Sequence, residues 1–308
     1  MKKISTRMMV EEYLKYRKIN LKQYSYSIIE NIIKKHFLNY FENVCLNDLK
    51  PTDINDYYIS IANLDLKPKT KNNIISTVMV MINWLDIMEY INSSISRKFK
   101  QIIKSFPLTE SPKSDYLTKE EIDKLISNIK VNNREDELEK IMIELLAYSG
   151  IRKSELRGLS YSDIDKDLSI IRINKQLQTI TTNGKTEEVL VQYTKTNKNR
   201  IVYVPKWLIN ELLNYQLKNK VNDKELIFNY KVVKINRILN KHLNNAHLKH
   251  IKIHDLRHSY CTMLYENGAN SKFVQIQMGH SSDRVSRDIY EHLTNKMQEA
   301  GRHIIDLL

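Results

Sequence analysis

The spacing of apolar residues predicts helices along most of the chain. Over residues 8–91, apolar positions recur three and four residues apart, as at Ile28 and Ile32, which is the period of a helix with one buried face. The segments 47–53 and 67–70 each contain a proline in a polar context and lead into a new apolar pattern. The first hundred residues are therefore predicted to form a small all-helical domain with four helices.

Residues 106–115 interrupt the helical pattern. They contain two prolines and two serines and show no periodicity, which is typical of a linker. We expect this linker to separate a helical domain, residues 1–105, from a larger domain, residues 116–308. Thr118 and Glu121 have the spacing of a capping box, which predicts the first helix of the second domain.

The second domain is predicted to be helical except between residues 163 and 205, where β-branched residues alternate with others. The predicted strands lie at residues 170–173, 189–191 and 201–204. Polar turns at 182–184 and 196–199 separate them, so each strand is expected to pair with the next. The predicted fold class is mainly α with a small antiparallel β-sheet.

Composition and charge indicate the class of partner. The chain has 308 residues, of which 42% are hydrophobic and 28% charged, with six glycines and five prolines, as in a folded protein. Its formal net charge is +13 and its pI is near 9.4. The excess of basic residues is spread over both predicted domains, so the expected partner is an anion, and most simply nucleic acid, that contacts both.

Several classes of protein are disfavoured by what the sequence lacks. It has neither an apolar run of membrane-spanning length nor the apolar core of a secretory signal, so a cytoplasmic protein is expected. Cys45 and Cys261 are too few for a disulfide framework and lack the spacing of a zinc site. Both are expected to pack as ordinary side chains.

Four residues of the second domain stand at positions that suit phosphate chemistry. Arg152 comes two residues after Gly150, which is predicted to end a helix, so this arginine lies at a corner where its guanidinium can bind a phosphate. His254 and Arg257 are three residues apart and share a helical face. His280 follows Gly279, the predicted end of helix 271–278. Each residue alone is weak evidence of a site.

A fifth candidate lies on the next predicted helix. Ser281 or Ser282 is expected to cap that helix, which carries Tyr290. Tyr290 is followed by Glu291 and His292, and by itself such a tyrosine would be interpreted as a residue of the hydrophobic packing.

The order of the motifs carries more information than any one of them. The sequence resembles the tyrosine recombinase, or phage integrase, family from about Tyr116 onward, and its first domain is similar to the family's DNA-binding core-binding domain. The motifs are Gly-Ile-Arg-Lys-Ser-Glu-Leu at 150–156, Thr-Lys-Thr at 194–196, His-Asp-Leu-Arg-His at 254–258, Met-Gly-His-Ser-Ser at 278–282 and Asp-Ile-Tyr-Glu-His at 288–292.

The resemblance implies six catalytic residues, namely Arg152, Lys195, His254, Arg257, His280 and Tyr290. The chain departs from the family pattern at Met278, where many members have leucine, and at Asn199, where a small hydroxyl residue is common. Neither change removes a functional group. Lys198 and Lys185 lie in nearby turns and are alternatives to Lys195.

The implied reaction cuts and rejoins DNA strands through a 3′-phosphotyrosine on Tyr290. Arg152 and Arg257 would bind the non-bridging oxygens, and Lys195 would protonate the leaving 5′-hydroxyl. Which of the two histidines assists the loss of the tyrosine proton stays open. The bond energy is held in the covalent intermediate, so neither cofactor nor metal is expected.

The implied partners are double-stranded DNA with paired inverted half-sites and three further copies of the chain, as a homo-tetramer. Residues 295–308 have an amphipathic pattern and are predicted to form a protomer-exchange helix that docks on a neighbouring protomer, with folding back on their own domain as the alternative. The layout is similar to the Xer type, without an arm-binding domain. Integration, excision, inversion and dimer resolution remain open, and an accessory directionality factor is compatible with them.

Two other functions fit part of the pattern. A type IB topoisomerase shares the Arg, Lys, Arg, His and Tyr set, but the helical domain ahead of the catalytic one argues against it. A non-catalytic DNA-binding protein on the same fold would have no need of all six residues.

Overall fold

The computed structural model describes residues 5–108, 115–182, 185–192 and 199–279. The chain divides into two compact units. The first comprises residues 1–111 with 179–188, and the second comprises 112–178 with 189–308. Each unit has its own hydrophobic core. No helix among the described residues is long and apolar enough to span a membrane.

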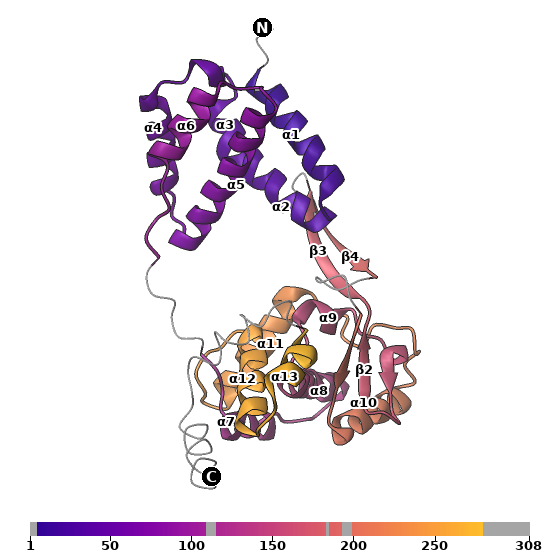
Figure 1. Cartoon of the computed structure of the whole chain (residues 1–308). Coiled ribbons are helices and arrows are strands. Elements are labelled where there is room, and N and C mark those ends of the chain that lie inside the picture. Colours follow the sequence, from indigo (N-terminus) through magenta and orange to yellow (C-terminus); the bar gives the residue numbers. More distant parts are fainter. Residues whose placement is uncertain (1–4, 109–114, 183–184, 193–198, 280–308) are drawn as a thin grey trace, which may run out of the picture. The chain divides into compact units, whose positions relative to one another are not determined.

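Within residues 5–108, the first unit is built from helices (Figure 1). A π-helical turn, Lys34–Leu38, joins the second helix to the third without a break. The helices are α1 (Thr6–Asn20), α2 (Gln23–Ile33), α3 (Asn39–Phe41), α4 (Pro51–Ala62), α5 (Pro68–Ile87) and α6 (Ser93–Ile102).

The predicted helix starts in this unit are confirmed. Proline occupies the first position of both α4 and α5, where its fixed φ suits a helix and no N–H is needed. Asp53 accepts a hydrogen bond from the Lys50 backbone N–H at 2.8 Å, which caps α4. Four helices were predicted up to residue 91, and the structure has α1 to α5 there, with α2 and α3 joined by the π-helical turn. Helix α6 follows them, and Ile95 and Phe99 lie on its buried face.

The second unit surrounds its core with seven helices among its described residues, α7 to α13 (Figure 1). Helix α8 is buried along most of its length and packs against both α10 and α12. The capping box predicted at Thr118 is present at the start of α7. The helices are α7 (Lys119–Ser127), α8 (Arg134–Ser149), α9 (Lys153–Arg157), α10 (Lys206–Asn219), α11 (Val232–Asn245), α12 (Ile253–Glu266) and α13 (Ser271–Met278).

The strands form two small sheets rather than the single meander that was predicted. The strands are β1 (Ile164–Asp165), β2 (Ile170–Ile173), β3 (Gln176–Thr182), β4 (Lys185–Val191) and β5 (Arg200–Tyr203). One sheet has the antiparallel order β1-β2-β5, with Ile171 opposite Val202, and the other pairs β3 with β4. The predicted strand at 189–191 therefore pairs with β3 and not with β2. The mainly α class with a small antiparallel sheet is confirmed.

The difference in pairing has a physical reason. Ile171 and Val202 are fully buried, so pairing β2 with β5 places their apolar face on the core of the unit. Residues 186–191 of β4 include Glu187 and Glu188, and none of these six residues is buried. Local patterning predicted β2, β5 and part of β4, but not β1 or β3, and the choice of pairing partner followed burial.

Candidate active site

Arg152 lies at the corner between α8 and α9, as predicted. Gly150 ends α8 in the left-handed conformation, with φ of 64°, and Arg152 is the extended N-cap residue of α9. The Glu155 carboxylate accepts hydrogen bonds from the backbone N–H of Arg152 at 2.7 Å and from its Nη1 at 2.9 Å. The guanidinium is thereby fixed beside the first turn of α9.

Arg257 projects from α12 toward the same corner and is almost fully buried. Its Nη1 donates to the Gly150 carbonyl and its Nη2 to the Met278 carbonyl. Burial, followed by the nearby charges of Arg152 and Arg200, lowers its pKa to about 9. Arg257 therefore remains protonated at neutral pH, but its charge is poorly neutralised and would be stabilised by an anion.

His254 lies one helical turn before Arg257. The residue is exposed to solvent at the pocket, and its ring centroid is 4.8 Å from that of His258. Partial burial, together with His258 and Arg257, lowers the pKa of His254 to about 4. The imidazole is neutral at pH 7, so it can donate a hydrogen bond through one nitrogen and accept one through the other.

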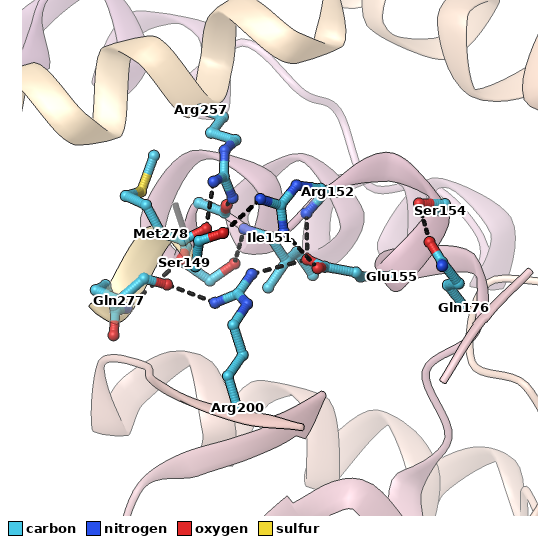
Figure 2. Close-up of polar contacts among 12 residues, drawn as sticks. Ser149, Ile151, Arg152, Ser154, Glu155, Gln176, Arg200, Arg257, Gln277 and Met278 are labelled. Carbon is cyan, nitrogen blue, oxygen red and sulfur yellow. Dashed lines mark hydrogen bonds and ion pairs between the residues drawn. The ribbon is translucent and has the colours of Figure 1, made fainter. Parts of the chain in front are cut away.

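Three arginine side chains converge on the C-terminal end of α13 (Figure 2). Its last carbonyls have no partner within the helix and carry partial negative charge. Three consecutive carbonyls each accept a hydrogen bond from a different arginine. The pairs are Arg200 with Gln277, Arg257 with Met278 and Arg152 with Gly279.

Glu155 connects two of these arginines. Its side chain is fully buried, and it accepts from Arg152 through Oε1 and from Arg200 through Oε2, the latter at 2.8 Å. Burial alone would raise the pKa of this carboxyl, but the charges of Arg200 and Arg152 lower it overall. Glu155 is therefore a buried carboxylate paired on both oxygens.

A pocket of about 420 Å³ opens beside these groups. Arg152, His254 and Arg257 all line it, so the structure brings together three of the six predicted residues. The described lining includes no carboxylate, and its full set is Ile151, Arg152, Lys153, Asn236, Leu239, Asn240, Ile251, Lys252, Ile253, His254 and Arg257. Basic and amide donors around an open pocket suit a phosphodiester.

The other three predicted residues, Lys195, His280 and Tyr290, lie outside the described part of the chain. Gly279, the residue directly before His280, is described and belongs to the site through its carbonyl. Among the described residues, no group of three or more His, Cys, Asp or Glu side chains is placed to hold a metal ion.

Three residues of the site were not predicted from the sequence, namely Arg200, Glu155 and Gln277. Glu155 stands three residues after Arg152 and could have been found from its capping position. Arg200 shares the inward side of β5 with Val202, so an arginine on a buried face was a signal available in the alternation. Gln277 gave no local signal, because its partners lie on other elements.

Comparison with known proteins identifies the class. The model of the phage integrase family matches residues 115–297, and that of the phage integrase N-terminal SAM-like domain matches residues 7–61. The chain belongs to the phage integrase family. It is thus a tyrosine recombinase, a DNA-binding enzyme of site-specific recombination, as the sequence predicted. The topoisomerase and non-catalytic alternatives are not favoured.

Individual relatives extend over nearly the whole chain. The ICEBs1 integrase of Bacillus subtilis (strain 168) is 26% identical over 99% of this chain and 84% of its own. A XerC-like tyrosine recombinase of Caldanaerobacter subterraneus subsp. tengcongensis is 27% identical over 85% of this chain and 73% of its own. The Tn1549 transposon integrase, solved in complex with transposon right-end DNA, shares the fold with a TM-score of 0.75 at 17% identity, covering 98% of this chain and 100% of that one.

Proposed function

We propose that this recombinase cleaves DNA by attack of Tyr290 on a phosphodiester and rejoins it through a 3′-phosphotyrosine. The observation that carries the proposal is the convergence of Arg152, Arg257 and the neutral His254 on one pocket. A tyrosine hydroxyl titrates near pH 10, so its proton must leave during attack on an anionic phosphate. Fixed positive charge at the phosphate lowers the cost of removing the tyrosine proton, and it also reduces the repulsion between the attacking oxygen and the phosphate.

Arg152 and Arg257 would bind the two non-bridging oxygens. A guanidinium has five N–H groups, and two of those of each arginine are engaged by the protein. The remaining N–H groups are available to a phosphate, and charge-assisted bonds of this kind are short and directional. Because the arginines are already held in place, little reorganisation is needed as charge develops.

His254, His280 and Lys195 would complete the reaction. The neutral His254 can hydrogen-bond a phosphate oxygen, and His280, next to Gly279, would contribute a second imidazole. Lys195 would give a proton to the leaving 5′-oxygen, so that the products are a phosphotyrosine and a free 5′-hydroxyl. Attack by a 5′-hydroxyl of a second duplex then releases Tyr290 and restores the backbone.

The test of this reaction is a covalent adduct formed in excess EDTA. Incubation with a nicked duplex should give a protein–DNA species that persists on a denaturing gel, because arginines and histidines supply the charge stabilisation that metal ions provide in many nucleases. Peptide mapping should place the nucleotide on Tyr290. Loss of cleavage on chelation, or a nucleotide on another residue, would contradict the proposal.

The substrate would be double-stranded DNA with paired inverted half-sites, bound by a homo-tetramer. The net charge of +13 and the DNA complex of the Tn1549 integrase support binding to duplex DNA. A relative that matches 99% of the chain is named as an integrase, which supports a role in integration and excision. The same chemistry serves inversion and dimer resolution, and an accessory factor would set its direction.

Residues 295–308 would act as the protomer-exchange helix of this tetramer. A contact of each tail with the next protomer is heterologous and closes a ring of four. A chain ending at Thr294 should keep its affinity for one half-site but lose cooperative binding to two, and with it strand exchange. Gel shifts on one and two half-sites measure both quantities. Unchanged cooperativity would contradict docking in trans, and general unfolding would indicate packing in cis.

A further inference from the structure

Arg200 is a buried arginine of the site to which the reaction above assigns no role. It opens β5, and only 9% of its side chain is exposed. Its Nη2 donates to Glu155 and its Nη1 to the carbonyl of Gln277 (Figure 2). It is absent from the lining of the pocket formed by Arg152 and Arg257, so its contacts are with the protein.

The contact with Glu155 determines how the charge of this carboxylate is divided between two arginines. The buried carboxylate has one negative charge and two arginine partners, Arg152 and Arg200. Without Arg200, Glu155 would pair with Arg152 alone and would neutralise the guanidinium that faces the pocket. Interactions between charges are strong in such a poorly solvated place. Arg200 therefore preserves the positive charge that Arg152 offers to a phosphate.

The second contact fixes the turn that precedes His280. Arg200, Arg257 and Arg152 hold the three successive carbonyls of residues 277–279. A methyl group built on Gly279, whose φ is 62°, would lie 2.6 Å from both Cδ and Nε of Arg200. The aliphatic part of Arg200 thus packs directly on this turn, where there is no room for a larger residue.

Docking of α13 itself does not depend on Arg200. The Gln277 amide pairs with the backbone of Tyr203, accepting from its N–H at 3.0 Å and donating to its carbonyl at 2.8 Å. The buried side chains of Val274 and Met278 add an apolar contact. Removal of Arg200 is therefore expected to leave α13 in place and to free only its last turn.

We propose that Arg200 is a positioning residue, which holds Glu155 and the 277–279 turn so that Arg152 is correctly placed for the scissile phosphate, without itself touching DNA. This inference rests on the proposed function, since it concerns the same phosphate site. A residue that only stabilised the fold would not change the rate of cleavage once DNA has bound. A positioning residue would change that rate.

The test compares Arg200→Gln and Arg200→Lys with the wild type in single-turnover cleavage of a nicked duplex at saturating protein. Arg200→Gln should lower the rate by about 10²-fold, as loss of a preorganised electrostatic contact does. Its half-site affinity should change by less than about threefold, since a typical phosphate contact is not lost. Arg200→Lys should recover part of the rate, because lysine restores the charge but not the two-pronged geometry.

The matched control is Arg172→Gln. Arg172 lies on β2 opposite Ile201, and its ion pair with Asp165 is half exposed. Loss of such a surface pair costs little, so wild-type cleavage is expected. Gly279→Ala, which displaces Arg200 without changing its charge, should resemble Arg200→Gln.

Three results would overturn the proposal. One is cleavage by Arg200→Gln at the wild-type rate, and another is a loss explained entirely by weaker binding or by unfolding in a melting curve. The third is full rescue by a 5′-bridging sulfur substrate, which would place the effect in protonation of the leaving group. The hydrogen-exchange rate of the Gly279 backbone amide can be measured without catalysis. This rate should increase in Arg200→Gln, because the turn is held less firmly. Absence of an adduct with wild-type protein would instead count against the proposed function.

Discussion

Tyr290→Phe is expected to bind its DNA site normally and to form no covalent adduct. The substitution removes one oxygen, which is the proposed nucleophile, and leaves the arginines and the basic surface unchanged. Loss of a nucleophile that acts together with its activating groups typically reduces the rate by about 10⁴-fold or more. On a denaturing gel with a nicked duplex, the slow protein–DNA band should disappear, while gel shifts on intact duplex should match those of the wild type.

Tyr260→Phe provides the control for this experiment. Tyr260 is a partly buried tyrosine of the same unit, and its hydroxyl accepts a hydrogen bond from Gln277 at 3.1 Å. Its loss should cost stability of about 1 kcal/mol, as for an ordinary hydrogen bond, and leave the adduct in place. An adduct with Tyr290→Phe, or none with Tyr260→Phe, would contradict the assignment of the nucleophile.

The parts of the fold that the sequence predicted are those with a local cause. Gly150 and Gly279 were expected to end helices, and both have a positive φ at a helix end. A left-handed cap involves only a few neighbouring residues, so its signal is complete in the sequence. The positions of Arg152 at a corner and of His254 and Arg257 on one helix follow from such local signals.

The parts that the sequence did not predict depend on residues far apart along the chain. The pairing of β2 with β5 skips β3 and β4, and it was decided by the burial of Ile171 and Val202 on a common core. Arg200 reaches Glu155 across 45 positions and Gln277 across 77. A motif can name the residues that contact a substrate, but the groups that hold those residues in place are set by tertiary packing.

Lys195→Ala is expected to cleave ordinary DNA about 10²- to 10⁴-fold more slowly, which is the usual contribution of a general acid. The leaving 5′-oxygen would otherwise depart as an alkoxide, a poor leaving group at neutral pH. Replacing that bridging oxygen by sulfur removes the need for a proton, because a thiolate is stable near neutral pH. Cleavage of the sulfur substrate by Lys195→Ala should therefore approach the wild-type rate.

The neighbouring lysines decide whether this result is specific. Lys198→Ala and Lys185→Ala each remove one positive charge close to Lys195 in the sequence, so they should weaken DNA binding slightly and cleave the oxygen substrate at nearly the wild-type rate. A slow Lys198→Ala enzyme that sulfur rescues, beside a normal Lys195→Ala enzyme, would assign the general acid to Lys198. A loss in Lys195→Ala that sulfur does not restore would show that this lysine acts on the phosphate or on DNA binding. In that case the proton would come from another group, and the roles of His254 and His280 would have to be reassigned first.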